Sequence, residues 1–219
     1  GGSIYKYANI ASMKSHGIEF TISSKNIQSK DFSWNTDFIF SKAKNEVTEL
    51  NARSSVMDLV SGYGFARQGY PVRGLFSIPF VGLSSNGIPM YNINGKITST
   101  DIDFQTRDNI DYLKYEGPTD PTITGSFGNI FTYKAFKLNV FITYSFGNVV
   151  RLNPCFNYQY SDLSSMPREF KNRWTVPGDE KHTNIPAIIS KRQYEDNKDL
   201  MYAYNAYNYS TERIAKGDF

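Results

Sequence analysis

The sequence predicts a mainly β protein whose strands are long and antiparallel. Apolar and polar side chains alternate over several runs of about ten residues, which is the periodicity of a half-buried strand. The chain of 219 residues contains 16 Tyr, 16 Phe and 2 Trp, and aromatic residues favour strands. The connections alternate between short polar turns and long polar segments, so the two ends of the predicted sheet differ.

The first pair of strands is expected over residues 16–26 and 31–42, with a polar turn at 25–30 between them. This pattern predicts an antiparallel hairpin. The residues that share one side are Ile18, Phe20, Ile22, Phe32, Trp34, Thr36, Phe38 and Phe40.

A second pair of strands is expected over residues 123–133 and 136–160, joined by a tight turn at Lys134-Ala135. Gly147-Asn148 inside the last run could be a hairpin turn or a bulge. We favour the bulge, because a turn there would place a tight connection at the end of the sheet that carries the long loops.

Two long loops are predicted, over residues 51–121 and 161–216. The first is rich in Gly, Pro, Asn and Ser, with helical periodicity only around 56–60, and the second contains a predicted short helix near 193–206. Connections of this length are usually functional. Tight turns at one end of spanning strands and long loops at the other are typical of outer-membrane barrels, whose long loops are extracellular. The two long loops are separated by two strands and a tight turn, so both are expected at the same end of the sheet.

The composition argues against several other classes of protein. The net charge is only +3, which gives no reason to expect a nucleic-acid partner. No apolar run approaches the length of a membrane helix. The start of the chain has no pattern of a signal peptide. Cys155 is the only cysteine, so no intrachain disulfide can form.

Specific residues then resemble one family. Asn9, Ala11, Met13, Gly17 and Glu19 are similar to the pattern N-x-G-x-M-x-N-x-G-x-E that begins a strand in SusC/RagA-type TonB-dependent transporters. The sequence departs from it at Ala11 and at Ser15. Further stretches resemble the family in the right order, and they are Phe32-Ser33-Trp34-Asn35, Gly69-Tyr70-Pro71-Val72, Gly82-Leu83, Gly87-Ile88-Pro89, Gly117-Pro118-Thr119-Asp120-Pro121, Arg173-Trp174-Thr175-Val176-Pro177-Gly178-Asp179 and Gly217-Asp218-Phe219.

The resemblance implies that residues 1–219 are a late part of an outer-membrane barrel, an incomplete set of strands from a total of about twenty-two. It implies a receptor that imports glycans or peptides, is energised through TonB, and works with a SusD/RagB-like surface lipoprotein. TonB would be contacted by a missing N-terminal part, and the strands would face outer-membrane lipid.

No catalytic residue, metal ligand or cofactor is predicted. His16 and His182 are far apart and have no metal-binding spacing. Cys155 is expected to be an inert strand residue. The stretch 62–67 superficially resembles a glycine-rich phosphate loop. It lacks the third glycine and the flanking strand and helix that a dinucleotide-binding fingerprint requires. The acidic pairs Asp101/Asp103 and Glu195/Asp196 lie in polar stretches without the frame of a calcium loop.

Aromatic residues in the loops are the remaining candidates for a site. Their rings could stack on sugars or peptides, or could pack the loops onto each other. Arg173 and Asp179 are expected to hold a local turn through an ion pair. The ligand-binding candidates are Tyr63, Phe65, Tyr70, Tyr91 and Trp174, with Tyr112 as a further loop aromatic.

Two other functions stay open at this point. One is a free-standing secreted β-domain that binds carbohydrate. The other is an enzyme such as a glycoside hydrolase, which needs two carboxylates converging on a cleft. A non-enzymatic receptor is the expected function.

Overall fold

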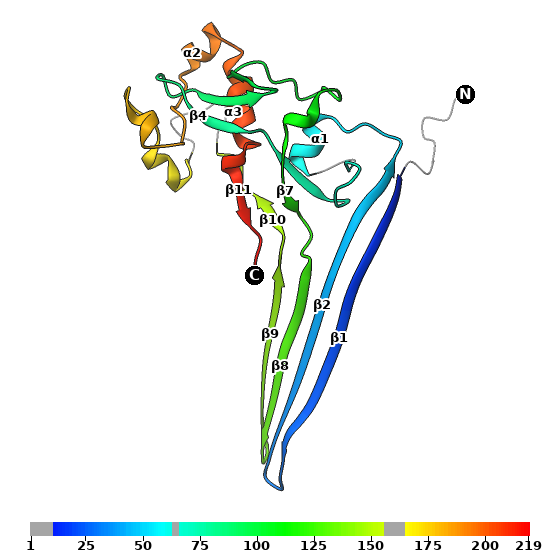
Figure 1. The fold of residues 1–219 in the computed structure, drawn as a ribbon. Coiled ribbons are helices and arrows are strands. Elements are labelled where there is room, and N and C mark those ends of the chain that lie inside the picture. The colour runs from blue at the N-terminus through cyan, green and yellow to red at the C-terminus, as the bar shows by residue number, and fades with distance from the viewer. Residues whose placement is uncertain (1–10, 63–65, 156–164) are drawn as a thin grey trace, which may run out of the picture.

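A computed structural model describes the chain over residues 11–62, 66–155 and 165–219. Its main element is a sheet with the strand order β1-β2-β8-β9, in which all neighbours are antiparallel. The strands are β1 (Ala11–Gln28), β2 (Phe32–Leu50), β8 (Ile123–Tyr133) and β9 (Phe136–Phe146). Figure 1 shows these long strands projecting from a folded region at one end, with both hairpin turns at the far end. The predicted fold of long antiparallel strands is confirmed, and within the described residues the sheet does not close into a barrel.

The strand boundaries agree in part with the prediction. β8 coincides with residues 123–133, and Tyr133 pairs directly with Phe136 across the predicted turn. The first turn lies at residues 29–31 instead of 25–30. β1 runs on to Gln28 because its polar side chains bond across the hairpin, as when Asn26 Nδ2 donates to Thr36 Oγ1 over 2.6 Å.

The strand predicted over 136–160 is interrupted. β9 ends at Phe146, and β10 (Val149–Arg151) pairs with β11 (Ile214–Lys216) instead of turning back onto β9. The hairpin alternative was therefore wrong. Gly147 interrupts the ladder with a φ of +83°, in the left-handed region that favours glycine. Regular pairing stops at Arg151, so the prediction of a strand was wrong for residues 152–155. Residues 156–160 of the predicted strand lie outside the described residues.

The sheet has one apolar face and one polar face. The cross-strand row through the middle of the apolar face consists of Ile22, Phe38, Phe127 and Ile142. The adjacent row on the other face consists of Thr21, Ile39, Ser126 and Thr143. Because directly opposite residues share a face, the alternation in each strand adds up to a two-sided sheet.

Aromatic rings lie in the middle row of the apolar face and toward both of its ends. Trp34 stacks on Phe131 near the turns, with ring centroids 5.7 Å apart. Phe20 stacks on Phe40 nearer the loops, at 5.1 Å. Polar atoms on this face bond to each other: Asn129 Oδ1 accepts from Trp34 Nε1 at 2.9 Å and from the Thr36 hydroxyl at 2.8 Å.

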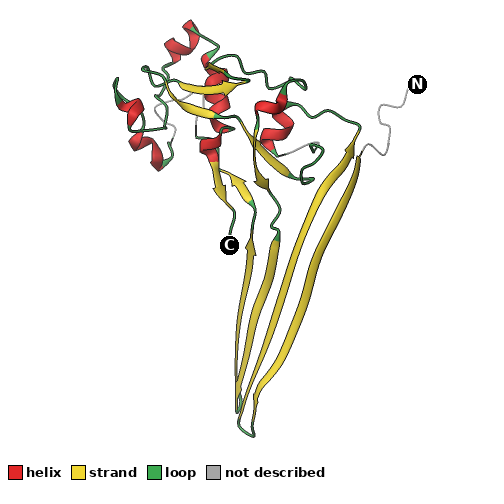
Figure 2. Cartoon of the chain, viewed as in Figure 1, coloured by secondary structure: helices red, strands yellow, loops and turns green. Residues whose placement is uncertain are grey.

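The two predicted long loops fold together at one end of the sheet (Figure 2). We call the described parts of residues 51–121 and 149–216 the loop region. Its first half contains α1 (Val56–Ser61), a β3–β7 pair (Gly74–Ser77 with Lys114–Pro118), the three-stranded sheet β4-β5-β6 (Phe80–Leu83, Pro89–Ile93 and Lys96–Thr98) and the 3-10 turn η1 (Ile110–Tyr112). Its second half contains η2 (Arg168–Asn172), η3 (Asp179–Lys181), α2 (Lys191–Asp196), α3 (Leu200–Asn208) and η4 (Thr211–Arg213).

Two helices replace the single one predicted at 193–206. The break follows Asp196, because Asn197 has a non-helical φ of −143°. α2 begins with a capping box between Ser190 and Gln193, and α1 begins with one between Ser55 and Asp58. No helix in the described residues has the length and apolar character needed to cross a membrane.

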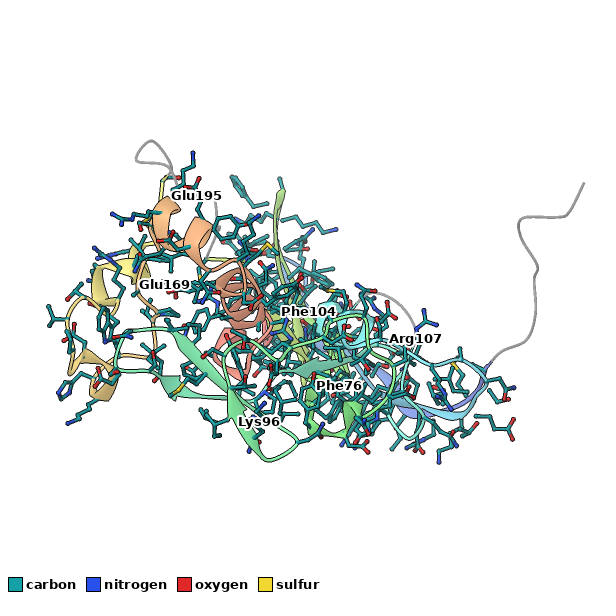
Figure 3. All side chains as sticks on the ribbon, turned by 90° about the horizontal axis from the view of Figure 1, so that it is seen from above. Phe76, Lys96, Phe104, Arg107, Glu169 and Glu195 are labelled. Carbon is teal, nitrogen blue, oxygen red and sulfur yellow. The ribbon has the colours of Figure 1, made fainter. Side chains whose placement is uncertain are left out.

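The hydrophobic core lies in the loop region, because the long sheet is a single layer. It joins α1, β3, β5 and α3 through fully buried residues such as Val56, Phe76, Tyr91 and Ala206. Viewed from above, Phe76 and Phe104 lie among crowded side chains at the centre of this region, with Lys96 and Arg107 at its margins (Figure 3). The loops are therefore positioned by each other, with the sheet as their base.

Candidate ligand-binding surface

Two of the five predicted ligand-binding aromatics, Tyr63 and Phe65, lie outside the described residues. Tyr70 packs against the core. Its ring is 5.0 Å from that of Phe76 and 4.9 Å from that of Tyr115, and the Arg67 guanidinium lies 5.4 Å from its centroid. Tyr70 thus links the start of the first loop to the β3–β7 pair.

Tyr91 is a core residue. Its side chain is 0% exposed, and its hydroxyl donates to the Ala203 carbonyl oxygen over 2.6 Å. Burial raises the pKa of Tyr91 well above its usual value. A ring with no exposed surface packs the loops together, so the structure corrects the prediction of direct ligand contact. Tyr112 packs against the same core, and burial raises its pKa to about 12.

Trp174 holds the second loop against the β4–β5 turn. Its Nε1 donates to Glu180 Oε2 at 3.1 Å, and its backbone N–H donates to the Ile185 carbonyl oxygen at 2.9 Å. The indole lies so close to Gly87 that a Cβ there would be 2.5 Å from Trp174 Cδ2. The indole also borders a mainly apolar cavity of about 290 Å³, whose other lining residues are Asn86, Ile88, Ala187, Ile188, Ile189, Gln193, Leu200 and Tyr204.

The turn beside Trp174 is held by hydrogen bonds and not by the predicted ion pair. Asp179 Oδ2 accepts from the backbone N–H groups of Thr175 and Val176, at 2.9 and 3.0 Å, and from the Thr175 hydroxyl. These bonds lower the pKa of the Asp179 carboxyl. Arg173 instead donates to the Phe170 carbonyl oxygen at 3.1 Å. A carboxylate that collects local N–H donors stabilises such a turn without a cation.

A second cavity, of about 280 Å³, lies where the long sheet meets the loop region, and we call it the junction pocket. Its lining residues are Ser15, Ala43, Lys44, Asn45, Pro71, Arg73, Tyr115, Pro118, Asp120, Pro121 and Thr122. Ser15 pairs with Asn45 in the same alternation as Ser23 with Asp37. The junction pocket is therefore at the loop end of the polar face.

The junction pocket contains an ion pair and several polar groups. Arg73 Nη1 lies 2.8 Å from Asp120 Oδ1, and both side chains are about half exposed. Asn45 Oδ1 accepts from the Val72 backbone N–H at 2.8 Å, which fastens the loop to β2. Burial raises the pKa of Tyr115, so its hydroxyl stays protonated at neutral pH.

The remaining sequence candidates do not converge. His16 lies in β1, whereas His182 follows η3. Asp101 pairs with Lys96, and in the described part of the chain no three acidic, His or Cys residues form a metal-binding group. Glu195 and Asp196 pair with Lys191 and Arg192 within α2.

Cys155 lies beyond the end of β10, so its prediction as a strand residue was wrong. It is buried against Phe170 and Tyr207. Its backbone N–H donates to Asn208 Oδ1 at 3.1 Å, and burial raises the pKa of its thiol to about 11. A buried thiol with a raised pKa is a poor nucleophile.

Comparison with known proteins supports one family. No protein-family model matches the sequence. The TonB-dependent receptor P3 of Formosa agariphila is 26% identical over 90% of this chain, and the TonB-dependent receptor P39 of the same organism is 24% identical over 97%. Both alignments run through nearly the whole chain, as the motifs in the sequence do. The chain is therefore similar to TonB-dependent receptors over nearly its whole length.

A similar fold is seen in solved structures. The chain superposes on a chain of the RagAB peptide transporter with a TM-score of 0.66 at 18% identity, and on one of the RagAB peptide importer in the 'open-open' state with a TM-score of 0.59. Each superposition covers 97% of this chain and 22% of the other. The likeness is one of fold. The chain spans about a fifth of the length of its curated relatives, 22% and 23%.

Arg151 is a further residue of structural importance that was not predicted from the sequence. Its guanidinium donates to the carbonyl oxygens of Val60, Phe76 and Ser210 over 3.0, 2.6 and 3.2 Å. Burial lowers its pKa to about 10, so it stays charged at neutral pH. The only signal in the sequence was an arginine at the end of an alternating run, which by itself indicates a solvated strand residue.

Proposed function

We propose that this chain is a segment of an outer-membrane nutrient receptor, with the apolar face of the sheet against lipid and the polar face toward the lumen. The two-faced sheet carries the proposal. In the described chain Ile142 is 55% exposed on the apolar face, Leu138 59% and Ile22 55%. Large apolar side chains exposed together on one face mark contact with a membrane or another protein.

The distribution of aromatic residues supports lipid as the contacting medium. Trp34 and Phe131 lie toward the turns, and Phe20, Phe40 and Tyr144 lie toward the loops. The apolar row between the two groups contains Ile22 and Ile142 together with Phe38 and Phe127. Outer-membrane barrels carry aromatic girdles at both membrane interfaces and an apolar band between them. The loop region then lies outside the cell and the hairpin turns lie in the periplasm.

The proposed cargo is a glycan or a peptide, and import is energised through TonB. The relatives are named TonB-dependent receptors, and the solved neighbours are a peptide transporter and importer. The family resemblance implies a surface lipoprotein of the SusD/RagB kind as partner, and the loop region is the surface that would meet it. The residues that contact cargo would come from the junction pocket.

The alternative of a secreted carbohydrate-binding β-domain is less well supported. Such a domain would leave the apolar face of a single-layer sheet in water, at a cost on the order of 25 cal/mol for each Å². A hydrolytic enzyme has no support from the relatives, which are receptors.

The test is uptake by the intact receptor. We expect cells that carry it to accumulate fluorescently labelled oligosaccharide or oligopeptide, and to lose this ability when either the receptor or TonB is removed. Uptake that continues at the same rate without TonB would contradict the proposal.

A further inference from the structure

We infer that the junction pocket binds a carboxylate group of the cargo, with Arg73 as the residue that recognises it. This inference rests on the proposed function, since it concerns the same polar face, and it specifies the chemistry of the cargo. A uronate in a glycan and the C-terminus of a peptide both supply such a group.

The location of the junction pocket fits a site for cargo. Ser15, Asn45 and Thr122 contribute to it from the polar face, and Arg73 and Asp120 contribute from the first loop. The walls of the pocket include the prolines Pro71, Pro118 and Pro121. Because the backbone φ of proline is fixed, these walls are stiff. A group held here lies at the entrance from the loop region to the polar face.

The hydrogen-bonding capacity of the junction pocket favours an anion. Arg73 contacts Asp120 through Nη1 alone, at 2.8 Å, although a guanidinium has five N–H donors in a fixed fork. Within the part of the chain that the structure describes, Asn45 Nδ2 and the Tyr115 hydroxyl donate to no protein atom. An acceptor-only group such as a carboxylate would satisfy these donors.

Asp120 supports Arg73 in this role. One carboxylate contact fixes the end of the flexible side chain and leaves the other guanidinium edge for a ligand, where bidentate pairing with a carboxylate is strong. Thr119 N–H donates to the Arg73 carbonyl oxygen at 2.9 Å, so the backbone of the two loop segments is held together as well. A neutral sugar ring would use fewer of these donors. A cation would be repelled by the positive charge of Arg73.

The experiment measures binding to the intact receptor in detergent by calorimetry. The probes are an oligogalacturonide and its carboxyl-reduced neutral form, and a tetrapeptide with a free C-terminus and its C-terminal amide. We expect one acid to bind more tightly than its neutral partner, by about ten- to a hundred-fold for a hydrogen-bonded charge. Preference for the uronate identifies a glycan cargo, and preference for the free C-terminus identifies a peptide.

Substitution then assigns the effect to Arg73. Arg73→Gln should remove the preference for the acid, and Arg73→Lys should keep part of it. Arg53→Gln is the matched control, since Arg53 forms an exposed ion pair with Asp108 at the same 2.8 Å, outside the junction pocket. The inference is overturned if neither acid is preferred, or if Arg73→Gln and Arg53→Gln act alike. Uptake that depends on TonB but is indifferent to Arg73 would leave the proposed function standing.

Discussion

Arg151 Nη2 donates to the Phe76 carbonyl oxygen over 2.6 Å, although the two residues are 75 positions apart in the chain. The same guanidinium bonds to α1 through Val60 and to the end of the second loop through Ser210. One side chain on β10 therefore joins both halves of the loop region.

Replacing Arg151 should loosen the loop region. Arg151→Ala leaves three carbonyl oxygens without their donor, and each such loss costs about 1–3 kcal/mol when the group is buried. We expect a large fall in protease-resistant receptor at the cell surface. Arg151→Lys keeps the positive charge but loses the planar guanidinium group that donates to three carbonyl oxygens at once. Its effect should therefore be intermediate. Equal abundance of Arg151→Ala and the wild type would contradict the role given to Arg151.

Cys155 should react slowly with thiol reagents. With a thiol pKa of about 11, roughly one molecule in a thousand is a thiolate at pH 8. Quantitative mass spectrometry of the peptide that contains Cys155 should show little alkylation in folded receptor and full alkylation after unfolding. Because the pKa is raised on folding, the stability linked to the neutral thiol is present below about pH 9 and is lost as the pH rises through 11. Rapid labelling at pH 8 would show that the thiol is not buried.

Trp174 should matter more for assembly than for binding. Trp174→Ala removes the contact with Gly87 and the bond to Glu180, and a lost aromatic contact costs about 1 kcal/mol beyond area burial. We expect less folded receptor at the surface and unchanged binding by each folded molecule. Tyr70→Ala should behave in the same way, because the Tyr70 ring packs on Phe76 and Tyr115. Normal abundance with weakened binding would indicate contact with cargo.

Both halves of the loop region should be reachable from outside the cell. Single cysteines at the exposed positions Arg107 and Lys181, in a Cys155→Ser background, should both react with an impermeant maleimide on whole cells. A cysteine at Lys30, in the hairpin turn at the other end of the sheet, should react only after the outer membrane is opened. Protection of either loop position on whole cells would reverse the proposed topology.

The sheet could be predicted from the sequence because period-two alternation is a local signal. β8 was found at its correct bounds, since Ile123 and Tyr133 end a run that pairs along its whole length. The loop region could not be predicted, because its core depends on contacts across long stretches of chain, such as Phe80 with Tyr207. Helical periodicity around residues 56–60 was the only local signal of α1 in the sequence, and the capping box at Ser55 is seen in the structure.

The candidate site was less predictable than the sheet. Loop aromatics can pack or bind, and nothing local distinguishes Tyr91, which is fully buried, from Trp174, which borders a cavity. Arg73 and Asp120 are 47 positions apart, so their ion pair and the junction pocket around it emerge only in the fold.

If the apolar face of the sheet lies in lipid, charge substitutions on neighbouring residues of β9 should have opposite consequences on the two faces. Ile142 belongs to the apolar row and Thr143 to the polar row. An arginine on the lipid face of a barrel near the bilayer midplane costs about 2–4 kcal/mol, whereas a lumen position tolerates one. The measurement is the amount of heat-modifiable, folded intact receptor in outer membranes. We expect a severe loss for Ile142→Arg and near-normal amounts for Thr143→Arg. The reverse order, or equal amounts, would show that the apolar face does not lie in lipid.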